Sequence, residues 1–240
     1  YTLSCLSDDG HVYAEQEQLL KSAIELLEAD QDSIVQAMKE MVESEQLIMD
    51  GDVIYLPPFY YAEIGTANKL KNLMGSTSMK AVPVQPNIQA ISLQTGIEYD
   101  DVQVDAIRQA VNSKVMVLTG GPGTGKTTTT QGIIAALKDM GLKILLAAPT
   151  GRAAKRMSEA TGMEAKTIHR LLEYNPADGY KRNDENPIEG DVLIVDECSM
   201  IDILLMNNLV KALSESMRLI LVGDIDQLPS VGAGNVMRDI

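Results

Sequence analysis

Residues 120–127 have the types and spacing needed to hold the phosphates of a nucleoside triphosphate. Gly120 is followed, after four residues, by Gly125-Lys126-Thr127. Glycines let a backbone turn its N–H groups inward around phosphates, and the N-terminus of a following helix adds partial positive charge. The Lys126 ammonium suits the β- and γ-phosphates, and the Thr127 hydroxyl suits Mg²⁺. The apolar run before the loop and the helical pattern after it argue against an ordinary glycine-rich turn.

An acidic pair follows the apolar run at 191–195. Asp196 at a strand tip is placed to hold Mg²⁺, and Glu197 is placed to orient and deprotonate an attacking water. A helix-capping acid pair is the alternative. The position of the pair, about 70 residues after the glycine-rich loop in an α/β pattern, favours the catalytic interpretation. Water as the nucleophile indicates hydrolysis rather than kinase chemistry.

A third polar run, GDIDQLP from Gly223 to Pro229, follows the apolar run at 218–222. Its Gln227 is predicted to contact the γ-phosphate and to report whether ATP or ADP is bound. A polar β-turn is the alternative. The predicted catalytic residues are Lys126, Glu197 and Gln227, and the predicted metal ligands are Thr127 and Asp196. The loop residues predicted to bind the nucleotide are Gly121, Pro122, Gly123, Thr124, Gly125, Lys126, Thr127 and Thr128.

The elements that must position these residues alternate between apolar runs and helical patterns. The apolar runs lie at 115–118, 143–148, 191–195 and 218–222. The helical patterns lie at 127–140, 152–160 and 202–215. Continuous apolar strands alternating with helices indicate an α/β fold, with a parallel sheet covered on both faces. We expect this domain to span residues 99–240.

The first 75 residues have a different pattern. Helical periodicity at 14–29, 34–45 and 59–74 surrounds an Asp50-Gly51 pair between two β-prone runs. Helix, helix and hairpin is the order of a winged-helix module, so residues 1–75 are predicted to form a small, mostly helical domain. Residues 76–98 lose this periodicity and are predicted to connect the two domains.

Charge and cysteine usage narrow the binding partners and the cellular location to expect. Of the net charge of −14, −11 falls on residues 1–100, which argues against strong nucleic-acid binding there. A local basic stripe, such as residues 151–156, can still bind nucleic acid on an acidic protein. Cys5 and Cys198 lack metal-ligand spacing and suit a reducing, cytoplasmic location. No apolar run approaches the ~18 residues of a membrane span, so no membrane partner is expected. The start at Tyr1 indicates a piece of a longer chain.

Six stretches resemble the RecD-like family of superfamily 1 DNA helicases. They are VQVDAI with Gln103, GGPGTGKTT, APTGRAAKRM, TIHRLL, VDECSM and GDIDQLPSVGAGN. The resemblance implies a RecA-like P-loop NTPase that uses ATP and Mg²⁺ to unwind DNA in the 5′-to-3′ direction. It also implies that Gln103 hydrogen-bonds the adenine base. The positions implied to lie along single-stranded DNA are Pro149, Thr150, Gly151, Arg152, Thr167 and His169. A buried histidine is an equal alternative for His169, and Arg152 is alternatively a residue that holds its own helix.

The resemblance extends to two further regions. Family members carry a small β-hairpin at the place of 173–190 and use it as a wedge at a DNA duplex junction. Tyr174 and Tyr180 around Asp178-Gly179 favour a hairpin here, with a surface loop as the alternative. GHVYAEQEQLL and VIYLPPFYYAEIGTANKL resemble the region before the motor in stand-alone members, where the acidic charge favours a scaffold role.

A superfamily 1 motor has two RecA-like halves, and the second supplies transition-state arginines. Only 11 residues follow Pro229. The resemblance therefore implies a monomer whose second half is missing here, so that this fragment binds nucleotide weakly and hydrolyses it very slowly.

The motifs argue against a P-loop ATPase of another class, such as an AAA+ ATPase or a kinase. Lys39, the only base in 34–45, argues against a winged-helix regulator. The helicase subunit of a recombination nuclease complex remains the closest alternative.

Overall fold

The structure, a computed structural model, describes residues 1–75, 83–227 and 230–240. The chain forms two compact units. The N-terminal unit comprises Tyr1–Ala67, Met200–Asn207 and Pro229–Ile240. The sheet unit comprises Asn68–Ser199 and Asn208–Leu228. Among the described helices, none combines the length and hydropathy that crossing a bilayer requires.

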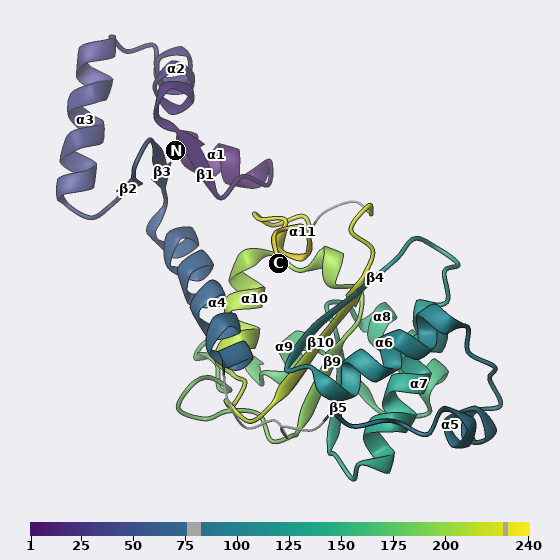
Figure 1. The fold of residues 1–240 in the computed structure, drawn as a ribbon. Coiled ribbons are helices and arrows are strands. Elements are labelled where there is room, and N and C mark those ends of the chain that lie inside the picture. The colour runs from purple at the N-terminus through teal and green to yellow at the C-terminus, as the bar shows by residue number, and fades with distance from the viewer. Residues whose placement is uncertain (76–82, 228–229) are drawn as a thin grey trace. The chain divides into compact units, whose positions relative to one another are not determined.

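A five-stranded parallel sheet forms the centre of the sheet unit, in the order β4-β10-β9-β5-β6 (Figure 1). The strands are β4 (Val115–Thr119), β5 (Ile144–Ala148), β6 (Ala165–Thr167), β9 (Val192–Val195) and β10 (Arg218–Gly223). All four predicted apolar runs are strands, and all four residues of β9 are fully buried. The α/β prediction is therefore confirmed.

Strand β6 was not predicted from the sequence. It has three half-buried residues and pairs only with β5, at the edge of the sheet. So short a segment, Ala165-Lys166-Thr167, shows no apolar run. Its pairing to β5, which lies about 20 residues earlier in the chain, defines it as a strand.

Helices α6 and α7 lie together on one side of the sheet (Figure 1). The helices of this unit are α5 (Ile88–Thr95), α6 (Asp101–Asn112), α7 (Lys126–Asp139), α8 (Gly151–Thr161) and α9 (Ile168–Leu171). Helix α10 (Ile203–Lys211) belongs to the sheet unit from Asn208 onward. Ile107 of α6 and Ile133 of α7 are fully buried in the same core as Ile194 of β9.

Part of the segment expected to connect the domains is folded. Residues 76–82 of that segment lie outside the described residues, but α5 occupies Ile88–Thr95. Asn87 caps its N-terminus and Gly96 ends it in the left-handed conformation. Ile91 is fully buried in the core of the sheet unit. Eight residues make too few turns for a clear periodic pattern, which explains why the sequence did not indicate a helix.

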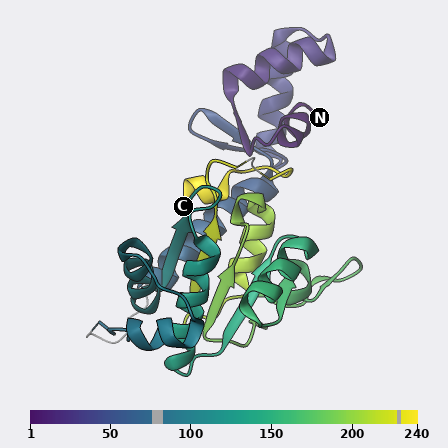
Figure 2. The same cartoon turned by 90° about the vertical axis from the view of Figure 1, so that its right-hand side faces the viewer.

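The N-terminal unit has the element order of a winged helix. Its elements are α1 (Thr2–Asp8), β1 (Tyr13–Glu15), α2 (Gln16–Leu27), α3 (Gln31–Glu43), β2 (Ile48–Asp50), β3 (Val53–Tyr55), the start of α4 (Pro57–Gly75) and α11 (Val236–Asp239). The three strands form an antiparallel sheet in the order β1-β3-β2. Gly51 has φ +61° in the predicted hairpin turn. Helices α2 and α3 are neighbours in both views (Figures 1 and 2).

Candidate nucleotide-binding site

The glycine-rich loop connects β4 to α7 at the carboxyl edge of the sheet. Gly123 and Gly125 have φ of +77° and +83°, a conformation that side chains with a Cβ rarely adopt. A Cβ at Gly120 would lie 2.6 Å from Thr124 Oγ1. The Thr124 hydroxyl instead donates to the carbonyl oxygen of Gly121, at 2.9 Å. The backbone conformation therefore favours glycine at positions 123 and 125, whereas at position 120 a Cβ would displace the Thr124 side chain.

Lys126 begins α7 and turns its ammonium back over the loop. Nζ donates to the carbonyl oxygens of Gly120 and Gly121, the second at 2.9 Å. The loop thus holds a positive charge above its own backbone. Anions bind favourably beside such a charge at a helix N-terminus.

The threonines after Lys126 differ in what their hydroxyls do. Thr129 Oγ1 donates to the carbonyl of Gly125, and Thr130 Oγ1 donates to that of Lys126. Among the described residues, the exposed Thr127 hydroxyl has no hydrogen-bond partner. The half-buried Thr128 has no such bond among the described residues either, so Thr127 and Thr128 are the threonines of this helix whose hydroxyls are available to a metal ion, and Thr127 is the more exposed of the two.

Asp196 and Glu197 follow β9 at the same edge of the sheet. Burial raises the pKa of Asp196, and the N–H of Glu197 and the charge of Lys126 partly lower it. That N–H donates to Asp196 Oδ1 at 2.9 Å. Glu197 has φ +55°, a left-handed conformation that costs a non-glycine residue roughly 1–3 kcal/mol. Such strain is concentrated at functional sites, because the surrounding structure must compensate for it.

Gln227 lies in an exposed turn after β10, while Leu228 and Pro229 lie outside the described residues. Its N–H donates to the carbonyl of Asp224 at 3.2 Å. The Asp224 side chain is only 2% exposed and accepts from the N–H of Asp226. We did not single out Asp224 from the sequence, although an aspartate directly after an apolar strand is the signal that identified Asp196.

The order of the strands brings these segments together. β10 lies between β4 and β9, so the glycine-rich loop, the Gln227 turn and the acidic pair leave three neighbouring strands at the same edge. The charge of Lys126 also acts on Asp196. In α/β proteins with parallel sheets, ligands bind at this edge.

Gln103 lies next to the loop, although it is 22 residues before Gly125 in the chain. Its backbone N–H and side-chain Oε1 form a reciprocal capping box with Asp100, at 2.9 and 3.2 Å. Nε2 faces Gly125, where a Cβ would lie 2.6 Å away. The capping box orients the amide so that its donor group faces the loop.

The residues expected along DNA gather at the ends of β5 and β6. Thr150 and Thr167 each cap a helix, accepting from the N–H of Ala153 and Arg170 at 3.2 and 3.3 Å. Ala148 pairs with Thr167 in the sheet, so the two caps are neighbours. Pro149 and Thr150 are half-buried, and Gly151 and Arg152 are exposed.

His169 is exposed, so the buried-histidine alternative is wrong. Its ring lies 5.5 Å from that of Tyr174 and 5.9 Å from that of Tyr180. Strands β7 (Tyr174–Asn175) and β8 (Gly179–Tyr180) form an antiparallel hairpin. Glu173 and Arg182 form an ion pair of 2.6 Å at its base. The hairpin and His169 therefore share one aromatic cluster.

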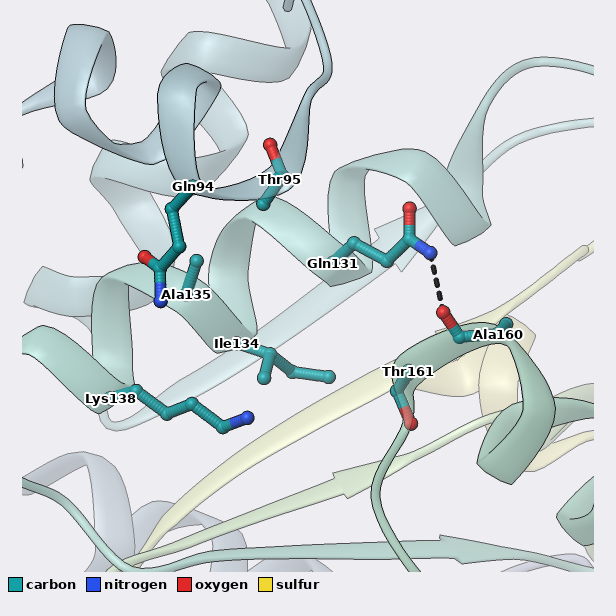
Figure 3. Close-up of a pocket in the computed structure, with 8 residues that line it drawn as sticks. All are labelled: Gln94, Thr95, Gln131, Ile134, Ala135, Lys138, Ala160 and Thr161. Atoms are coloured by element: carbon teal, nitrogen blue, oxygen red, sulfur yellow. Dashed lines mark hydrogen bonds between the residues drawn. The ribbon is translucent and has the colours of Figure 1, made fainter.

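A cavity of about 240 Å³ lies elsewhere in the sheet unit, between α5, α7 and α8 (Figure 3). Its lining includes Thr95, Ile134 and Lys138, and Gln131 donates to the carbonyl of Ala160 across it. None of the predicted nucleotide residues lines it. The candidate site is therefore formed by the loop and the strand ends, and this cavity is not part of it.

A parallel sheet with a glycine-rich loop opening a helix and an acidic residue on a nearby strand defines a P-loop NTPase fold. A family model described as an AAA domain matches residues 103–233. The chain belongs to this family, as one of its RecD-like members.

Two relatives and one solved structure illustrate the similarity. The ATP-dependent RecD2 DNA helicase of Deinococcus radiodurans is 40% identical over 181 residues, covering 75% of this chain and 25% of the relative. The RecBCD enzyme subunit RecD of Mycolicibacterium smegmatis is 35% identical over 215 residues, covering 79% and 38%. The crystal structure of Pif1 helicase from Candida albicans is 26% identical with a TM-score of 0.42, covering 56% and 34%, and supports no conclusion by itself.

Proposed function

We propose that this chain is the nucleotide-binding motor half of an ATP-dependent DNA helicase. The observation that carries the proposal is the meeting of the glycine-rich loop, Asp196-Glu197 and the Gln227 turn at one edge of the sheet. The names of the relatives support the helicase activity. The chain spans 25% and 38% of the length of the two relatives reported above, so activity, substrate and partners of the whole protein are part of the proposal.

The residues at this edge fit a nucleoside triphosphate with Mg²⁺. Backbone N–H groups around Gly123 and the Lys126 ammonium match the phosphates in charge and donor type. The unpartnered Thr127 hydroxyl and the Asp196 carboxylate are hard oxygen ligands of the kind that Mg²⁺ prefers. Bound Mg²⁺ would supply charge neutralisation at the phosphates.

Three further side chains have proposed roles in the reaction. Glu197 orients the attacking water and takes its proton. Gln227 contacts the γ-phosphate from the exposed turn after β10, and Gln103 Nε2 donates to the base. These assignments follow from the family resemblance and from the position of each residue at the loop.

Single-stranded DNA is proposed to cross the ends of β5 and β6. The capping of α8 and α9 by Thr150 and Thr167 leaves both helix N-termini at this edge, where backbone N–H groups favour phosphate oxygens. Arg152 is exposed beside them. Contacts of this type read no base sequence.

Replacing Arg152 with alanine should weaken single-stranded DNA binding by the full-length protein, equally for different sequences. One lost phosphate contact should make the slope of log K against log salt shallower by about 0.7. Fluorescence anisotropy with labelled oligonucleotides at several salt concentrations measures both quantities. Lys211→Ala removes an exposed charge from another helix and serves as the control. An unchanged slope for Arg152→Ala would show that Arg152 makes no phosphate contact.

The full-length protein should unwind a forked duplex that carries a 5′ single-stranded tail and should fail on a 3′-tailed duplex. A gel or fluorescence unwinding assay with both substrates, ATP and Mg²⁺ measures this polarity. Unwinding that does not require ATP, or that starts from the 3′ tail, would contradict the proposal.

For the 240-residue chain alone, we propose nucleotide binding with very slow hydrolysis, because family motors bind ATP between two halves.

The second candidate is the helicase subunit of a recombination nuclease complex. It is favoured by the 35% identity to a protein named as a RecBCD subunit. Purification of the full-length protein from its own source distinguishes the two candidates. Stable co-purification of a nuclease subunit would favour the complex, and an active single subunit would favour the stand-alone helicase.

A further inference from the structure

Two glycines of the α7 segment allow α6 to approach closely. A Cβ at Gly132 would lie 2.5 Å from Ile107 Cδ1 and 2.9 Å from the ring of Tyr99. A Cβ at Gly125 would lie 2.6 Å from Gln103 Nε2. Distances below 3 Å are too short for real carbon contacts, so a side chain at either position requires that the Gln103, Ile107 and Tyr99 side chains, or α6 itself, shift.

The spacing of these contacts connects them. Gln103 and Ile107 are four residues apart, about one helical turn, and face the same side of α6. Gly125 and Gly132 are seven residues apart, about two turns along α7. The packing of Ile107 and Tyr99 on Gly132 therefore determines how closely the N-terminus of α6, with Gln103, approaches the glycine-rich loop.

Tyr99 extends this packing to α5. Its hydroxyl donates to Thr95 Oγ1 at 3.0 Å, and Thr95 Oγ1 donates to the carbonyl of Ile91 at 2.8 Å. Figure 3 shows Thr95 at the end of α5, beside α7. Ile91 and Ile107 are both fully buried. Two contacts thus hold the start of α6. Ile107 of α6 packs on Gly132 of α7, and Tyr99, just before α6, is hydrogen-bonded to Thr95 of α5.

We propose that Gly132 is a positioning residue for recognition of the nucleotide base, with Tyr99 as its partner. Gly132 does not contact the substrate. It acts by allowing α6 to pack closely on α7. The inference rests on the proposed base contact of Gln103. Because phosphate binding depends on Lys126 and the loop, displacement of α6 weakens discrimination between bases and leaves binding of the phosphates intact.

Isothermal titration of the full-length protein with ATP, CTP and inorganic tripolyphosphate tests the proposal. Gly132→Ala should lower the affinity for ATP by about tenfold, as expected for the loss of one hydrogen bond, with tripolyphosphate affinity unchanged. The preference for ATP over CTP should fall as far as in Gln103→Ala, and the double variant should be no worse than Gln103→Ala alone. Tyr99→Phe keeps the ring and should cause a smaller loss of the same kind.

A rescue and a control sharpen the test. Ile107→Val removes the Cδ1 atom that meets the new methyl group, so it should partly restore the ATP preference of Gly132→Ala. Gly75→Ala also changes a helical glycine, at a position where a Cβ meets nothing within 4 Å, and should have no effect. A normal ATP preference in both Gly132→Ala and Tyr99→Phe, with loss in Gln103→Ala, would overturn this inference alone. A normal preference for ATP over CTP in Gln103→Ala would overturn the proposed base contact as well. The phosphate site is tested separately, by Lys126→Ala.

Discussion

Replacing Lys126 with alanine should lower the affinity for ATP by at least about 100-fold. The ammonium forms charge-assisted hydrogen bonds to phosphate oxygens, each worth roughly 1.5–3 kcal/mol, and 100-fold corresponds to about 2.7 kcal/mol. In the structure the same Nζ donates to the carbonyls of Gly120 and Gly121, so it already lies over the loop. Equilibrium binding of ATP to the 240-residue chain and to the full-length protein measures the effect.

The control for Lys126→Ala lies on the same helix. Lys138 is exposed in the last turn of α7, away from the loop, and Lys138→Ala removes the same charge. It should leave ATP affinity unchanged. Both variants should unfold at nearly the wild-type temperature, because water replaces the lysine at the half-buried loop carbonyls. Equal losses of affinity in the two variants would show that general positive charge, rather than the position of Lys126, holds the nucleotide.

Replacing Glu197 with glutamine should reduce DNA-stimulated ATP hydrolysis by the full-length protein by about 1000-fold. General-base catalysis contributes roughly 10²–10⁴ in rate, and an amide of the same shape accepts no proton. The affinity for ATP should stay close to that of the wild type, since Glu197 contacts water rather than phosphate in the proposed mechanism. A loss in kcat with unchanged binding identifies a group that acts in the transition state.

Steady-state kinetics and equilibrium binding together separate this role from a structural one. Glu197 follows the half-buried Asp196, whose Oδ1 accepts a hydrogen bond from the Glu197 N–H, and Glu197→Gln keeps that backbone bond. Glu189→Gln, a change at an exposed acid elsewhere in the sheet unit, is the matched control. Turnover by Glu197→Gln within tenfold of wild type would exclude Glu197 as the base. A parallel fall in ATP affinity would indicate a role in metal or phosphate binding instead.

The candidate nucleotide-binding site shows how much local sequence patterns predict. The glycine-rich loop, the acidic pair and the four long apolar runs were predicted from contiguous residues, and the strands lie where those runs are. Asp224 follows an apolar strand as Asp196 does, but its burial in the turn after β10 is a tertiary feature that the sequence did not show. The order of helix, helix and hairpin predicted for residues 1–75 matches α2, α3 and the β2–β3 pair, whereas α1 and the three-residue β1 were too short to be predicted.

The sequence alone predicted a phosphate loop from Gly120, Gly125, Lys126 and Thr127, because phosphate binding by such a loop depends on backbone conformation and charge within a few residues. Tertiary structure decided the rest. Packing of α6 on α7 placed Gln103 against Gly125, and pairing of β6 with β5 placed Thr167 beside Thr150. It also left His169 exposed against a hairpin. These contacts join segments that are distant in the chain. Close packing between helices and strands determines which segments come into contact, and no local sequence pattern encodes that packing.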